Sequence, residues 1–127
     1  ACETGLGDYT GGEGVQGLQR AFHLAGCPNA VASLWNVNDS ATAALMAKFY
    51  HEMWVNNKPP IEALREAQLT IYHHPELIAE LAGERGAPNQ KRVLELSPEE
   101  LAPAKPQAAK WADTKLWAAF VLSGLGK

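Results

Sequence analysis

The order of apolar and polar positions along the chain predicts helices that alternate with short apolar strands. Five segments have the apolar spacing or the capping residues of helices: about 13–25, 41–55, 59–73, 76–82 and 98–101. The apolar runs 30–35 and 116–124 are short and bounded by polar or turn-forming residues, so we predict two strands. Because helices flank the first run, we expect it to be a buried parallel strand. This order of elements predicts an α/β fold.

Two segments depart from this pattern. Residues 5–14 are rich in glycine and are expected to form a loop, because glycine at this density does not hold a helix. Residues 76–114 are rich in proline, alanine and charged residues. Apart from its two short helices, this second segment is expected to be a mobile surface excursion.

Composition and charge exclude several classes of function. The chain has 127 residues, a formal net charge of −3 and no run of Lys or Arg, which argues against a dedicated nucleic-acid-binding protein. No apolar stretch approaches the length that spans a bilayer. The four histidines and two cysteines do not have the spacing of zinc ligands, so we expect no metal and no cofactor. Free thiols in a reducing cytoplasm are expected, since no secretory signal is present.

The two cysteines have different surroundings in the sequence. Cys2 lies directly before the glycine-rich segment, an arrangement that presents a nucleophilic sulfur at the tip of a strand; the alternative is a small buried residue. Cys27, between Gly26 and Pro28 at a helix end, is expected to be buried without a chemical role. Neither an initiator Met nor a signal peptide precedes Cys2, so we expect the second half of an enzyme domain.

Several segments together resemble one family. Residues 1–7, with the sequence Ala-Cys-Glu-Thr-Gly-Leu-Gly, are similar to the nucleophile motif of CHAT domains, which are caspase-like peptidases often found beside tetratricopeptide repeats. Further segments are similar to that family in the same order: 12–22, 31–39, 62–65 and 117–124. The resemblance covers about residues 1–75 and 115–125, whereas the excursion at 76–114 departs from the more compact members.

This resemblance implies a caspase-like three-layer α/β sandwich, with Cys2 as the nucleophile at the carboxyl end of a central strand. The family takes its catalytic His from a position upstream of the Cys, where this sequence has no His. The resemblance also places Ser33, Trp35 and Asn36 on the strand that binds the substrate main chain. Asn36 stands where aspartate-specific caspases have a basic residue, so strict cleavage after Asp is not expected.

Some of these residues have two interpretations. Trp35 either forms a wall of the substrate pocket or belongs to the core. Asp39 either caps the helix that follows it or contacts a basic residue of the substrate. Asp8 and Glu13 either shape the pocket for the residue before the cleaved bond or are solvated acids; Glu13 also suits the first turn of a helix.

We therefore expect a cytoplasmic cysteine endopeptidase that cleaves peptide or protein substrates through a Cys–His dyad. Expected partners are the amino-terminal half of the same domain and tetratricopeptide-repeat or sensor domains, without nucleic acid or membrane. Residues 1–127 alone are expected to be inactive and prone to aggregation, because they lack the base and expose a sheet edge. The alternative function is a non-catalytic caspase-like scaffold or protein-interaction module.

Overall fold

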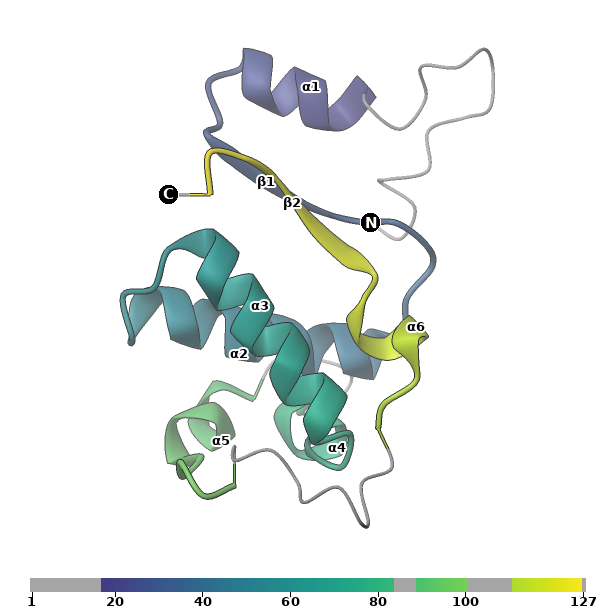
Figure 1. Cartoon of the computed structure of the whole chain (residues 1–127), viewed down its shortest axis with the longest axis vertical. Coiled ribbons are helices and arrows are strands. Elements are labelled where there is room, and N and C mark those ends of the chain that lie inside the picture. Colours follow the sequence, from purple (N-terminus) through teal and green to yellow (C-terminus); the bar gives the residue numbers. More distant parts are fainter. Residues whose placement is uncertain (1–16, 84–88, 101–110, 127) are drawn as a thin grey trace.

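The computed structural model describes residues 17–83, 89–100 and 111–126. These residues form helices on both sides of a small sheet (Figure 1). In chain order the elements are α1 (Gly17–Leu24), β1 (Asn29–Ser33), α2 (Asp39–Trp54), α3 (Pro60–His73), α4 (Leu77–Leu81), α5 (Gln90–Glu95), α6 (Thr114–Trp117) and β2 (Phe120–Gly124). No helix in these ranges is both long enough and apolar enough to cross a membrane.

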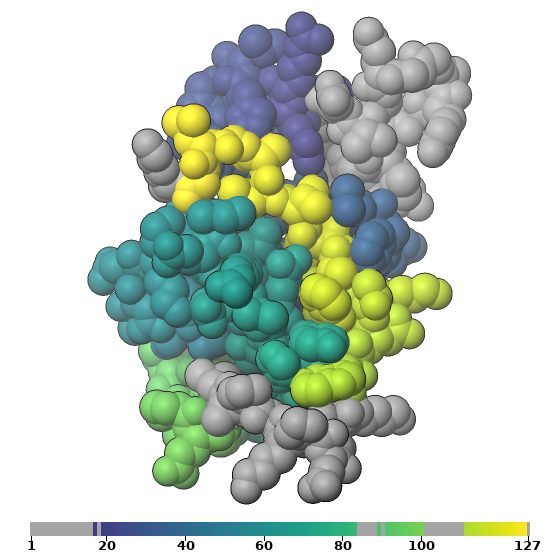
Figure 2. Space-filling view, in the orientation of Figure 1, coloured from purple at the N-terminus to yellow at the C-terminus, as the bar shows by residue number. Residues whose placement is uncertain are grey.

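The sheet consists of β1 and β2, which pair antiparallel from Asn29 opposite Gly124 to Ser33 opposite Phe120. In the space-filling view, β2 lies between α1 on one side and α3 on the other (Figure 2). Helices on both sides of a strand pair are compatible with the α/β class predicted from the sequence.

The expectation of a buried parallel strand at β1 was wrong for the described part of the chain. Its partner β2 is antiparallel, and three of the five β1 residues are only half-buried. The reason lies in the connection: α2 and α3 run in opposite directions and bring the chain back to the end of the sheet that it left (Figure 1). A chain that returns to that end must run back along β1.

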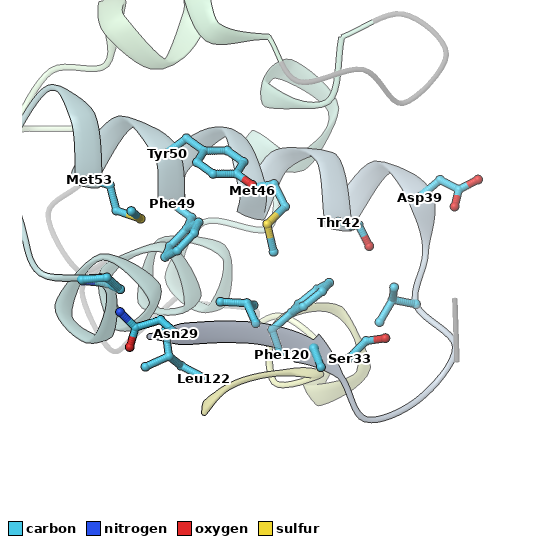
Figure 3. Close-up of a pocket in the computed structure, with 14 residues that line it drawn as sticks. Asn29, Ser33, Asp39, Thr42, Met46, Phe49, Tyr50, Met53, Phe120 and Leu122 are labelled. Atoms are coloured by element: carbon cyan, nitrogen blue, oxygen red, sulfur yellow. The ribbon is translucent and has the colours of Figure 1, made fainter. Parts of the chain in front are cut away.

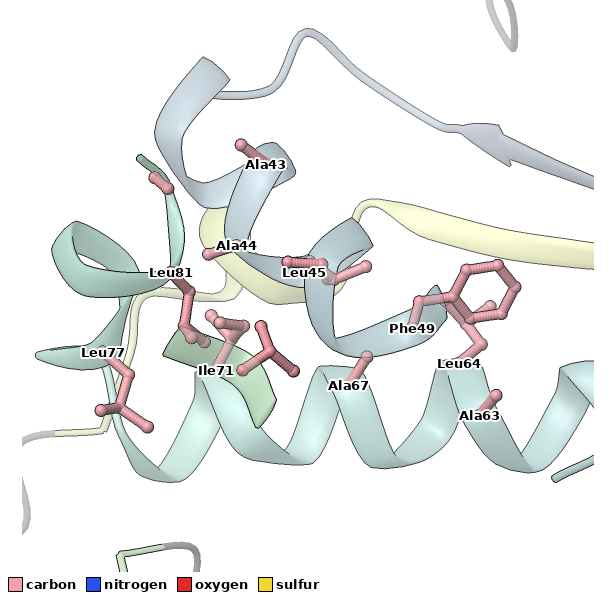
Figure 4. Close-up of a cluster of buried hydrophobic side chains, with 13 residues drawn as sticks. Ala43, Ala44, Leu45, Phe49, Ala63, Leu64, Ala67, Ile71, Leu77 and Leu81 are labelled. Carbon is pink, nitrogen blue, oxygen red and sulfur yellow. The ribbon is translucent and has the colours of Figure 1, made fainter. Parts of the chain in front are cut away.

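The core lies between α2 and α3, where small side chains let the two helices approach closely (Figure 4). Four alanines in this core are completely buried: Ala44, Ala47, Ala63 and Ala67. Because the distance between packed helices depends on the side chains at their contact, these alanines favour a close pair. Leu45, Ile71, Leu81 and Val93 are the largest fully buried side chains. Since Leu81 belongs to α4 and Val93 to α5, the two short helices complete this core.

The boundaries of the predicted elements need two comments. The helix expected at 13–25 is α1, and residues 13–16 lie outside the described residues. The strand expected at 116–124 was wrong in its first part, where the chain forms α6 instead and β2 begins only at Phe120. Asp113 explains this helix, because its Oδ1 accepts a hydrogen bond from the backbone N–H of Lys115 at 2.9 Å.

The expectation of a mobile excursion was wrong for the described parts of 76–114. The short helix expected at 76–82 is confirmed as α4. The next helix, α5, was not predicted; Asn89 caps it by accepting a hydrogen bond from the N–H of Arg92 at 3.2 Å. Val93 on α5 is only 1% exposed. This helix is therefore a packed element of the core.

The ends of the excursion are also attached to the rest of the molecule. Residues 98–100 form a turn instead of the predicted helix, and the Oγ atom of Ser97 accepts a hydrogen bond from the N–H of Glu100. Farther along, the ring of Trp111 stacks on that of Tyr72 at 5.0 Å between centroids. The N–H of Ala112 donates to the carbonyl of Tyr72. The chain thus returns from the excursion along the end of α3.

Candidate functional site

Three of the residues singled out in the sequence lie outside the described residues: Cys2, Asp8 and Glu13. Their roles stay predictions. The other four candidate residues fall between the end of β1 and the start of α2. The contacts of these four residues define the surroundings of that segment.

Ser33 is the last residue of β1 and is 5% exposed. The ladder continues one residue further, because the N–H of Leu34 donates to the carbonyl of Ala119 at 2.8 Å. Beyond this point the chain leaves the sheet, and the side chain of Asn36 is exposed. Ser33 and Asn36 therefore stand on either side of the point where β1 ends.

Trp35 lies beside α6. Its indole N–H donates a long hydrogen bond, 3.4 Å, to the carbonyl of Lys115, and the residue is half-buried. The core interpretation of Trp35 is not supported, because the cluster of buried apolar residues between α2 and α3 does not include it. This ring connects the segment after β1 to the short helix before β2.

The capping interpretation of Asp39 was wrong. Asn38 caps α2 instead, since its Oδ1 accepts a hydrogen bond from the N–H of Ala41 at 3.0 Å. Asp39 is the first helical residue and is exposed. Its negative charge is favourable there, because the positive end of the helix dipole lies at the amino terminus. The carboxylate thus stands at the surface, directly after the segment that contains the other candidates.

A groove of about 590 Å³ separates β1 from α2. Ser33 and Asp39 both line it, whereas Trp35 and Asn36 do not. Figure 3 shows Ser33, Thr42 and Asp39 together at one end of the groove, where β1 stops and α2 begins. Much of the remaining lining is apolar and includes Val31, Met46, Phe49, Met53 and Leu122. Such a groove suits a ligand that places an apolar side chain inside it and polar groups at the end with Ser33, Thr42 and Asp39.

The sheet offers a second binding feature. Within the described parts of the chain, β1 has β2 on one edge and no strand on the other. The open edge of a strand presents unpaired N–H and C=O groups, to which an extended peptide can add as a further strand. The groove and this edge both belong to β1.

Sequence reasoning missed a cluster of charged residues on α2 and in the turn after it. The carboxylate of Glu52, which is 3% exposed, pairs with Lys48 at 2.6 Å and Lys58 at 2.8 Å, and accepts a hydrogen bond from Asn56 at 2.9 Å. Burial raises the pKa of Glu52, but the hydrogen bonds from Lys48, Lys58 and Asn56 outweigh it and lower the pKa to about 2. The signal in the sequence was a Lys and a Glu four residues apart, which is also the spacing of ordinary surface pairs.

His23 on α1 has a different role. Its Nδ1 lies 2.8 Å from the carbonyl oxygen of Cys27, and its Nε2 lies 3.0 Å from the Oγ of Ser123. A carbonyl only accepts, so Nδ1 donates to it, while the hydroxyl of Ser123 can serve as donor or acceptor to Nε2. This imidazole ties α1 to β2. Cys27 itself is a free, exposed cysteine, so the expectation that it is buried was wrong.

The described residues define a chain of mixed helix and small antiparallel sheet, with a groove along one strand. Comparison with protein families identifies it more closely: the CHAT domain model matches residues 1–125, nearly the whole chain. This chain belongs to the CHAT domain family, which is associated with caspase-like cysteine peptidases. Comparisons with curated proteins and with solved structures gave no match.

Proposed function

We propose that this chain is part of a caspase-like CHAT domain that acts as a cysteine endopeptidase, with Cys2 as its nucleophile. The observation that carries the proposal is the family match over residues 1–125, which includes Cys2 and every other candidate residue. Helices on both sides of the sheet agree with a layered α/β sandwich. In this proposal, residues 1–127 form the carboxyl-terminal portion of the domain.

The general base of this reaction is proposed to be a His outside residues 1–127. None of the four histidines of this sequence lines the groove beside β1. One of them, His23, already uses both ring nitrogens in holding α1 to β2. A base from elsewhere in the protein is therefore the simpler partner for Cys2.

The proposed chemistry proceeds in two stages. The base takes the proton of the Cys2 thiol, and the thiolate attacks the carbonyl carbon of the peptide bond. The backbone N–H of Cys2 is the proposed donor to the oxyanion that forms. The carbon–nitrogen bond then breaks while the base returns its proton to the leaving amine. Water, activated by the same base, finally hydrolyses the thioester and releases the acid.

The surroundings of β1 support an expectation about the substrate. An extended peptide added to the open edge of β1 would direct alternate side chains towards the groove. The apolar lining suits an apolar side chain, and the carboxylate of Asp39 at the mouth suits a neighbouring basic one. Asn36 is uncharged, so no strict requirement for Asp before the cleaved bond is expected.

The test compares the intact wild-type protein with Cys2→Ala after incubation with a mixed proteome, and identifies new peptide amino termini by mass spectrometry. Cys27→Ala is the matched control, because Cys27 is the other cysteine of this chain and is free and exposed. Cleavages lost in Cys2→Ala and kept in Cys27→Ala would support the proposal.

The same experiment separates the alternative function. Identical profiles for the wild type and Cys2→Ala would contradict the peptidase and favour the non-catalytic scaffold. If cleavage depends on Cys2, Asp39→Asn tests the proposed recognition: cleavages next to basic residues should weaken relative to the others. An unchanged distribution of cleavage sites in Asp39→Asn would remove Asp39 from the substrate-binding residues.

A further inference from the structure

A second cavity lies on the other side of α2. It has a volume of about 640 Å³ and is formed by α2, α3, α5 and the residues that follow α5. Figure 1 shows α5 on the opposite side of α2 from the sheet. This cavity is therefore separate from the groove beside β1, and nothing in the proposed peptidase chemistry uses it.

A buried ammonium lines this cavity: the side chain of Lys48 is only 5% exposed. A Lys ammonium has three N–H donors. Among the described residues, Lys48 has one acceptor, the Oε1 of Glu52 at 2.6 Å. A buried donor without an acceptor is costly, so the two remaining N–H groups favour a ligand that supplies acceptor atoms.

Two imidazoles line the same cavity as Lys48. The Nδ1 atoms of His51 and His73 are both buried and have no hydrogen-bond partner within the described residues. Burial lowers the pKa of His51, with the charge of Lys48 acting in the same direction, so the neutral ring is favoured. A neutral imidazole can place its proton on either nitrogen and can therefore donate to an acceptor in the cavity.

The charged residues of the cavity limit the charge that its ligand can carry. Glu52 neutralises one of the two ammonium groups, Lys48 and Lys58, which leaves a single positive charge in this cluster. Glu66 also lines the cavity and acts electrostatically on Lys58, the more exposed of the two lysines, so the two lysines and two glutamates of the lining balance in formal charge and the N–H groups without an acceptor remain at Lys48. A dianion would be repelled by the two carboxylates, whereas a monoanion matches the donor-rich end at Lys48.

Part of the cavity lining is apolar. Leu69 comes from α3, and Val93, Leu94, Leu96 and Pro98 come from α5 and the residues after it. Leu94 is 60% exposed and Val93 is buried, so this wall extends from the core to the surface. A ligand that matches both the donors at Lys48 and this apolar lining has an anionic head and a short hydrocarbon part.

We propose that this cavity binds a small organic monocarboxylate, whose carboxylate accepts hydrogen bonds from Lys48, His51 and His73 while its hydrocarbon part lies against α5. The charge-assisted hydrogen bonds give the site its preference for an anion, and the apolar wall gives a preference for a hydrocarbon chain. The site does not depend on Cys2 or on the peptidase proposal.

Hexanoate is the probe for this proposal, and the intact protein is titrated with it by calorimetry. Hexanol has the same chain without the charge, hexylamine has the opposite charge, and inorganic phosphate has no hydrocarbon part. We expect hexanoate to bind at least tenfold more tightly than each of the three, because one charge-assisted hydrogen bond alone accounts for about that factor. Nitrogen-15 spectra should show the ring signals of His51 and His73 shifting with hexanoate.

Two variants locate the site. Lys48→Met should weaken hexanoate binding about tenfold or more. Leu94→Asp places a negative charge on the exposed apolar wall, where it is tolerated, and should weaken binding several-fold. Leu24→Asp on α1 is the matched control, since Leu24 is 79% exposed and does not line the cavity.

Several outcomes would overturn the proposal. Hexanoate that fails to bind, or binds no more tightly than hexanol, would remove the role of the carboxylate. Phosphate that binds more tightly than hexanoate would show that the site prefers a different anion. Equal loss of binding in Leu94→Asp and Leu24→Asp would show that the site is not beside α5. Lys48→Met and Leu94→Asp are independent, so misfolding of the first leaves the second as a test.

Discussion

Replacing Glu52 with Gln is expected to destabilise the protein by about 3 kcal/mol at pH 7. In the folded protein, hydrogen bonds from Lys48, Lys58 and Asn56 lower the pKa of Glu52 from its ordinary 4.5 to about 2. A difference of roughly 2.5 pH units, at about 1.4 kcal/mol per unit, corresponds to about 3 kcal/mol. This value agrees with the roughly 3–5 kcal/mol lost when one partner of a buried ion pair is removed.

The expected loss depends on pH in a definite direction. Because folding lowers the pKa of Glu52, its contribution is complete above the ordinary pKa of 4.5 and disappears as the pH falls towards about 2. The wild type should therefore lose this part of its stability over that range, and the difference from Glu52→Gln should close. Denaturant unfolding, followed by tryptophan fluorescence at pH 7, 4 and 2.5, measures the free energy of unfolding of both proteins.

Glu95→Gln is the control for this prediction, because Glu95 is exposed on α5 and a substitution there should change stability by less than about 0.5 kcal/mol. The double variant Lys48→Met with Glu52→Leu replaces the buried ion pair with apolar side chains. In this variant, most of the stability that Glu52→Gln loses should return. The reasoning is refuted if Glu52→Gln costs under about 1 kcal/mol at pH 7, or if its cost is the same at pH 2.5.

Two further predictions concern the attachment of individual elements. Asn38→Ala should lower the free energy of unfolding by about 1 kcal/mol through loss of the α2 cap, whereas Asp39→Asn should cost only a few tenths; thermal unfolding of both variants checks the order. Trp111→Ala removes the ring stacked on Tyr72 and should expose the end of α3, which hydrogen exchange at Tyr72 and Ala112 would detect as faster exchange than in the wild type. Unchanged exchange would show that this stack does not hold the returning chain.

The elements with strong local signals were predictable from the sequence. The helix α3 begins at a proline in the first-turn position and has a regular apolar stripe, and its predicted range agrees closely with the structure. The short apolar run at β1 was also found within about two residues. In both cases the local pattern and the final packing favour the same conformation.

The errors arose where distant contacts decide the structure. Val93 is buried because α5 packs against α2 and α4. No local sequence pattern predicted that contact, because the segment is rich in proline and charged residues. The antiparallel direction of β2 follows from the path of α2 and α3, and the residues of β1 alone do not predict that path. For α6 the signal was present, since Asp113 is a favoured capping residue before an apolar run.

The candidate site was predictable only in part. The resemblance directed attention to the segment after β1, and two of its residues, Ser33 and Asp39, do line one groove. The order of residues did not distinguish these from Trp35, which lies against α6. The pairing of Lys58 with Glu52 depends on the turn between α2 and α3, so the spacing along one helix did not reveal that cluster.

The position of α2 between two hollow regions has a mechanical consequence. Met46, Phe49 and Met53 face the groove beside β1, while Lys48 and Glu52 on the same helix face the cavity beside α5. A helix held to its neighbour by close-packed alanines moves as a unit, so a sideways shift that enlarges one hollow reduces the other. The helix α2 is thus a wall shared by the groove and the cavity, so a ligand that widens one of them narrows the other.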